Sequence, residues 1–64
     1  MKLYYSLLED EGEYGVQVTM GEEAMSLRRI TPVREDALSL LCALRRGTVT
    51  PVTLKDVVED WLLR

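Results

Sequence analysis

The sequence contains no histidine, no phenylalanine and a single cysteine among its 64 residues. Cys42 therefore has no partner for an intramolecular disulfide, and a zinc site without histidine would need an unusual ligand set. A catalytic thiol at Cys42 would lack a histidine base, and no glycine-rich phosphate loop is present. We therefore expect no enzymatic activity, no metal site and no cofactor.

The chain also lacks a hydrophobic stretch long enough to span a bilayer. Near the amino terminus, Glu9 and Asp10 interrupt the apolar residues before a signal-peptide core can form. A net charge of -3 disfavours general affinity for nucleic acid or anionic lipid, because phosphate binding depends on an excess of Lys and Arg. We expect a cytoplasmic protein with no membrane partner.

What the chain does have is the composition of a folded protein, with 47% hydrophobic and 30% charged residues. Residues 1–64 are expected to form a single domain. A domain of this size buries only roughly 60% of the surface that its unfolded chain exposes. Small cores are usually supplemented by disulfides, metals or oligomerisation, and here oligomerisation is what remains.

The first half of the sequence has the alternating pattern of β-strands. Residues 2–9 and residues 14–20 predict two strands, and the second alternates cleanly between apolar and polar side chains. Residues 25–30 predict a third strand, with Met25 and Leu27 facing inward. These three segments indicate an antiparallel meander.

The acidic residues 9–13 separate the first two predicted strands and contain Gly12, which suits a tight turn. Carboxylates in a row are potential ligands for a hard cation such as Ca²⁺. The length and spacing of this run do not match an EF-hand loop. A solvated hairpin turn is the favoured interpretation.

The second half of the sequence has helical periodicity, and the tripeptide Thr-Pro-Val occurs there at residues 31–33 and 50–52. Thr is favoured as an N-cap and Pro at the first helical position. The first copy predicts a helix over residues 32–46, with Thr31 as its N-cap and Gly47 ending it in the left-handed conformation. Its apolar stripe consists of Val33, Ala37, Leu40, Leu41 and Leu44.

The last helix has two possible starting points in the sequence. Thr50 with Pro51 is one N-cap, and Thr53 with Asp56 resembles a capping box. Residues 48–52 are accordingly a connector, a short strand or the helix start. The apolar stripe of this helix consists of Leu54, Val57, Val58, Trp61 and Leu62. The whole order predicts an α+β fold, a three-stranded antiparallel meander followed by two helices packed on one face.

Three segments resemble an uncharacterised family of short bacterial proteins, seen mainly in Gram-positive anaerobes and described as a domain of unknown function. They are Tyr14-Gly15-Val16, Thr50-Pro51 and the acidic-aromatic segment 56–62. The sequence departs from the family pattern at Thr53, where many relatives are expected to carry His. The resemblance brings no activity, cofactor or catalytic residue with it.

Several apolar side chains of the helical half fall outside the stripes or suit a binding hot spot. They are Leu38, Cys42, Val52, Trp61 and Leu63. For Cys42 and Trp61 a structural role in packing is the simpler interpretation. Taken with the small core, this set predicts a protein-interaction or assembly module that self-associates as a dimer through its helices or binds an unidentified protein.

The sequence also offers a candidate basic patch, made of Arg28, Arg29, Arg34, Arg45 and Arg46. These side chains gather at one end if the third strand and the first helix lie side by side. A patch of this kind would suit the alternative function, a small nucleic-acid-associated regulator. Edge protection and helix-end electrostatics explain the same residues without a ligand. The acidic balance makes nucleic acid the less favoured partner.

Overall fold

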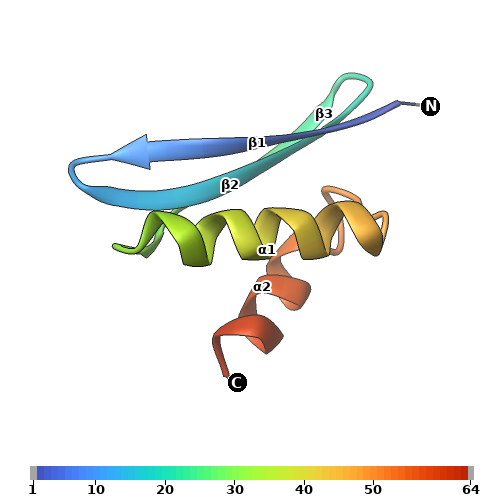
Figure 1. The fold of residues 1–64 in the computed structure, drawn as a ribbon. Coiled ribbons are helices and arrows are strands. Elements are labelled where there is room, and N and C mark those ends of the chain that lie inside the picture. The colour runs from blue at the N-terminus through green and yellow to red at the C-terminus, as the bar shows by residue number, and fades with distance from the viewer. Residues whose placement is uncertain (1, 64) are drawn as a thin grey trace.

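The computed structural model describes residues 2–63. Three strands are followed by two helices: β1 (Leu3–Asp10), β2 (Glu13–Met20), β3 (Glu23–Thr31), α1 (Arg34–Arg46) and α2 (Leu54–Leu62). The strands form one antiparallel sheet in the order β1-β2-β3, and α1 runs beneath it (Figure 1). The predicted α+β meander with two helices is confirmed.

Both hairpin turns contain only two residues. Between β1 and β2, Glu11 and Gly12 have φ values of 51° and 84°, the signs required by a type I′ turn. Between β2 and β3, Gly21 takes a φ of 61°. The first turn is shorter than the acidic segment 9–13, because Glu9, Asp10 and Glu13 pair within the strands.

The core-facing side of the sheet follows from the strand register. Val16 and Val18 of the central strand are fully buried and pack with residues of α1, which confirms the alternation predicted for residues 14–20. Met25 lies opposite Val18, and therefore on the same side of the sheet, as predicted. It is nevertheless 39% exposed, because β3 is an edge strand and has no strand on its outer side.

Helix α1 begins later than the sequence predicts. Its first residue is Arg34 and its N-cap is Val33, so the prediction that Thr31 is the N-cap is wrong. Thr31 stays in β3, where it pairs with Tyr14, and its hydroxyl oxygen accepts a hydrogen bond of 3.1 Å from the backbone N–H of Val33. The Thr-Pro-Val segment therefore forms the bend between strand and helix.

The apolar stripe of α1 packs on the sheet through Ala37, Leu40 and Leu44, as predicted, whereas Val33 precedes the helix and is exposed. The predicted left-handed ending at Gly47 is wrong, because its φ is -82°. The left-handed residue is Thr48, with a φ of 51°. The helix end is closed by the backbone N–H groups of Gly47 and Val49, which donate to the carbonyls of Ala43 and Leu44.

Of the two starting points for the last helix, the structure selects Thr53, which is the N-cap of α2. The Thr53 hydroxyl contacts Thr50 and makes no hydrogen bond to the first turn of the helix. Residues 48–52 form a connector with turns and no strand. Val49 within it is buried, and its carbonyl accepts a hydrogen bond of 3.0 Å from the Tyr5 hydroxyl. No helix formed by residues 2–63 is long and apolar enough to cross a membrane.

Candidate interaction surface

A bulge in β3 shapes the end of the sheet where β3 leads into α1. On either side of Gly15, β2 pairs with Leu27 and with Thr31, so residues 28–30 lie opposite a single residue. A Cβ atom on Gly15 would overlap the carbonyl oxygen of Leu27 and lie 2.8 Å from the Cα of Arg28. Glycine is required at this position because the bulged backbone passes directly over it.

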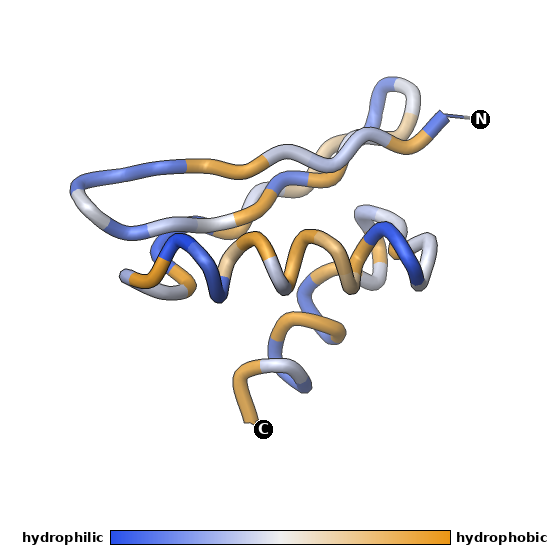
Figure 2. Tube along the Cα trace, in the orientation of Figure 1, coloured by the Kyte–Doolittle hydropathy of each residue, from blue (hydrophilic) through white to orange (hydrophobic). Residues whose placement is uncertain are grey.

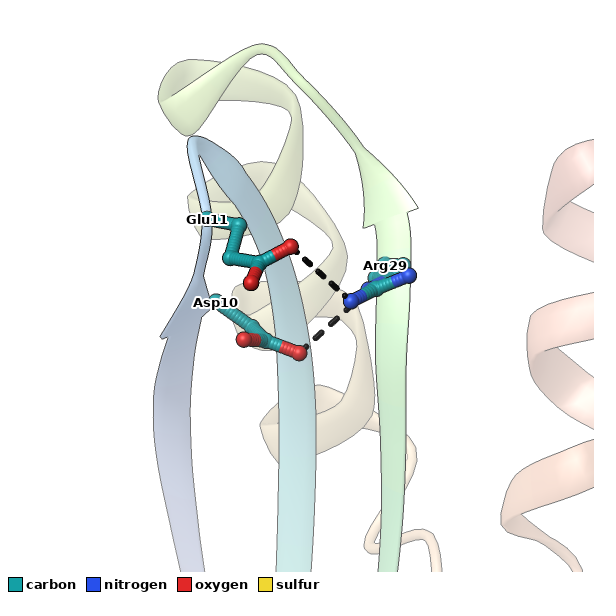
Figure 3. Close-up of polar contacts among 3 residues, drawn as sticks. All are labelled: Asp10, Glu11 and Arg29. Carbon is teal, nitrogen blue, oxygen red and sulfur yellow. Dashed lines mark hydrogen bonds and ion pairs between the residues drawn. The ribbon is translucent and has the colours of Figure 1, made fainter.

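The bulge also places Arg29 against the first hairpin. Arg29 has a φ of 56°, and its side chain reaches across β2 (Figure 3). Its Nε lies 3.3 Å from Oδ2 of Asp10, and its Nη2 lies 3.2 Å from Oε2 of Glu11. Two carboxylates of the acidic segment, which the sequence interpretation leaves to solvent, thus have a cationic partner. Both ion pairs are solvent-accessible, and such pairs contribute about 0–1 kcal/mol each.

An open groove separates the bulged part of β3 from α2. It encloses about 230 Å³. Its apolar lining comes from both elements: Leu27 and Ile30 from β3, and Val58 and Leu62 from α2. Charged residues complete the lining, and they are Arg28, Arg29, Lys55 and Glu59. The two elements therefore approach each other without closing over the apolar residues between them.

The apolar surface continues past the groove to the end of α2. Glu59, Leu62 and Leu63 line a second shallow hollow, which shares Glu59 and Leu62 with the groove. Leu62 is 51% exposed and Leu63 is 86% exposed. Figure 2 shows this hydrophobic colouring at the carboxyl-terminal end of the described chain. We call the apolar groove residues, together with Leu63, the α2 surface.

The residues predicted from sequence for an interface are dispersed over the helical layer. Leu63 belongs to the α2 surface, and Trp61 is half-buried against the core. Val52 is 77% exposed, at the opposite end of α2. Leu38 is half-buried on α1, while Cys42 is exposed and lines a shallow hollow with two arginines.

Most of the groove is not predicted from the sequence. Leu62 is predicted to belong to the core stripe of the last helix, and the structure leaves half of it exposed. The sequence pattern does not predict that Ile30 of β3 lines a groove. The bulge that turns this segment toward α2 depends on contacts with β2, which the local pattern does not show. The signal for the groove in the sequence is the apolar stripe of α2. The core buries Leu54 and Val58 of this stripe, and the stripe continues beyond them through Leu62.

The arginines of the candidate basic patch fall into separate groups. Arg28 and Arg29 line the groove, whereas Arg45 lies near the end of α1 beside Cys42. Arg34 begins α1, and the helical rise separates its backbone from that of Arg45 by about 16 Å. The structure therefore does not bring these side chains into one patch.

The sequence matches one family model over residues 1–64, described as a family of unknown function, DUF6514. No curated protein and no solved structure matches the chain. The family match covers every element of the fold and supplies no activity or ligand.

Proposed function

The chain belongs to the DUF6514 family of unknown function, and we propose from its structure that it is a non-enzymatic interaction module that self-associates through its helical layer, with the α2 surface as the contact. The observation that carries this proposal is the exposed apolar end of α2, continuous with the groove beside β3. A second copy of the chain is the proposed partner.

The exposed leucines supply the driving force for association. Full burial of one leucine side chain is worth about 1.5–3 kcal/mol relative to full exposure. Leu63 is almost fully exposed and Leu62 is half exposed. Leu62 lines the groove, and Leu63 lines the adjoining hollow. Apolar residues scattered singly over a surface need no explanation, whereas a continuous groove and helix end is typical of an interaction site.

The charges around the groove favour a second copy of the same chain. Arg28, Lys55 and Glu59 line the groove, so its rim carries charges of both signs. In a symmetric contact, the same surface is used by both copies, so a rim that carries both signs allows Glu59 of each copy to pair with Arg28 or Lys55 of the other. Charge complementarity of this kind determines orientation and suppresses other partners.

The size of the protein gives association a second benefit. A 64-residue chain buries a small core, and seven residues between positions 2 and 63 form its buried cluster. Binding that occurs only in the folded state adds to stability by mass action. We therefore expect the melting temperature to rise with protein concentration.

The decisive experiment replaces Leu63 by Lys and measures molar mass by light scattering across micromolar concentrations. Leu63→Lys places a charge on the contact and should lower the average molar mass relative to the wild type. Val33→Lys is the matched control, because Val33 is also an exposed apolar residue, outside the groove at the start of α1. A wild-type protein that remains at 7.3 kDa with a cooperative melt would refute the proposal.

A further inference from the structure

The two edges of the sheet differ in how they are protected. The edge at β3 carries a bulge and two consecutive arginines, and α2 lies alongside it (Figure 3). The edge at β1 has none of these features. From Leu3 to Leu8 it contains no charged residue and no proline, and it pairs with β2 without interruption. Natural proteins rarely leave such an edge unpaired, because its free backbone groups and apolar side chains are a template for another strand.

The backbone groups available at this edge follow from the first hairpin. A two-residue turn closes on a pair of residues that exchange both backbone hydrogen bonds, and here that pair is Asp10 and Glu13. Even-numbered residues of β1 therefore turn their N–H and C=O groups toward β2. The odd-numbered residues turn theirs toward the open edge, and they are Leu3, Tyr5, Leu7 and Glu9.

We propose that β1 pairs with β1 of a second copy of this chain, antiparallel and about a twofold axis that passes beside Ser6. The pairing joins two sheets into one. This contact is separate from the α2 surface, so the inference goes beyond the proposed function and identifies a second site of self-association.

The register centred on Ser6 satisfies the requirements of a symmetric strand pair. Facing residues must have the same parity, since otherwise the core-facing side chains of one copy would meet the outer face of the other. With Ser6 opposite its own counterpart, Tyr5 lies opposite Leu7 and Leu3 lies opposite Glu9. Each odd-numbered residue from 3 to 9, whose backbone groups point to the open edge, then has a backbone partner in the other copy.

The side chains on the outer face of the sheet agree with this register. The register centred on Ser6 places Lys2 of each copy opposite Asp10 of the other, at both ends of the pairing. Cross-strand pairs of opposite charge are stabilising. Lys2 is exposed, and Asp10 accepts from Arg29 through one of its two oxygens, so the carboxylate retains acceptor capacity. Between these ends, Tyr4 lies opposite Leu8, and Tyr4 is 57% exposed in the single chain.

The first test places charge at the centre of the pairing. Ser6 is exposed, so Ser6→Lys should leave the fold intact while setting two like charges directly opposite each other. Ser26→Lys is the matched control, because Ser26 is an exposed serine on the same outer face, located on β3. Ser6→Lys should lower the molar mass, and an equimolar mixture with Ser6→Glu should restore it. Equal molar masses for Ser6→Lys and Ser26→Lys would overturn the inference.

The second test is a covalent one and reports the register. Facing residues of a non-hydrogen-bonded antiparallel pair have Cα atoms about 4.5 Å apart, within the range that a disulfide bridges. Ser6→Cys in a Cys42→Ser background should therefore oxidise to a cross-linked dimer, identified by mass under non-reducing conditions. Ser26→Cys in the same background is the control, and cross-linking of both variants to the same extent would contradict the proposed pairing.

Combining these variants separates the two contacts. If both exist, the wild type forms species larger than a dimer, each of Leu63→Lys and Ser6→Lys reduces them to dimers, and the double variant is monomeric. If only Leu63→Lys changes the molar mass, the β1 pairing is refuted and the α2 contact is retained. If only Ser6→Lys changes the molar mass, the α2 contact is refuted and the β1 pairing is retained. Unchanged circular dichroism of each variant confirms that loss of association does not reflect unfolding.

Discussion

The hydroxyl of Tyr5 donates a hydrogen bond of 3.0 Å to the carbonyl oxygen of Val49, which joins the first strand to the connector before the last helix. The two residues are 44 positions apart in the sequence. Val49 is buried and Tyr5 packs against the core cluster. This contact therefore holds the connector, and with it the start of α2, against the sheet.

Removing the Tyr5 hydroxyl should destabilise the protein. Tyr5→Phe leaves the half-buried carbonyl of Val49 without this donor, and the expected loss is about 0.5–1.5 kcal/mol. For a domain of this size, each 1 kcal/mol lowers the melting temperature by roughly 4–8 °C. Tyr4→Phe is the matched control, since the Tyr4 side chain is largely exposed. Thermal unfolding of both variants by circular dichroism at one protein concentration makes the comparison, and equal melting temperatures would show that the hydrogen bond contributes nothing.

Gly15 should not tolerate a side chain. In Gly15→Ala the new methyl group would overlap the backbone of Leu27, so the bulge must shift or the strands must separate. We expect a loss of at least about 2 kcal/mol, in the range of strongly destabilising substitutions. Gly47→Ala is the control, because Gly47 has a φ of -82° and a Cβ there meets only ordinary contacts at 3.5 Å. Denaturant unfolding should show Gly15→Ala destabilised and Gly47→Ala within about 1 kcal/mol of the wild type.

Arg29 combines a left-handed backbone with two exposed ion pairs, and two substitutions separate these effects. Both Arg29→Ala and Arg29→Gly remove the contacts to Asp10 and Glu11. Only Arg29→Gly also relieves the left-handed backbone, which costs a residue with a side chain roughly 1–2 kcal/mol. The glycine variant should therefore be the more stable of the two in denaturant unfolding. A less stable glycine variant would mean that the bulge does not hold this conformation in solution.

The order and type of the elements are predictable from the sequence because they depend on local periodicity. The alternation of Val16 and Val18 and the helical spacing of Leu40 and Leu44 both correspond to buried faces in the structure. The helix boundaries are less accessible. Thr31 has the side chain of an N-cap, yet its pairing with Tyr14 keeps it in the sheet, and that pairing is a tertiary contact.

The candidate surface is less predictable than the fold, for a related reason. The groove depends on the bulge, and the bulge depends on Gly15 lying under the backbone of β3. A glycine inside an alternating strand is the signal that was available in the sequence, because it often marks a bulge or a close backbone approach. It does not indicate that Ile30 and Leu62 would line the same groove.

The contact between Tyr5 and Val49 also bears on the order in which the protein folds. The two hairpins involve neighbours in sequence, and hairpins form within about 1–10 μs. The link from β1 to the connector closes a much longer loop, whose entropic cost must be met before the contact forms. During synthesis, the amino-terminal hairpins can therefore form first. The hydrogen bond from Tyr5 to Val49 forms only after Val49 has left the ribosome. Until α1 has also emerged, the apolar side of the sheet lacks the helix that covers it, and in this interval a nascent chain would be most prone to aggregate.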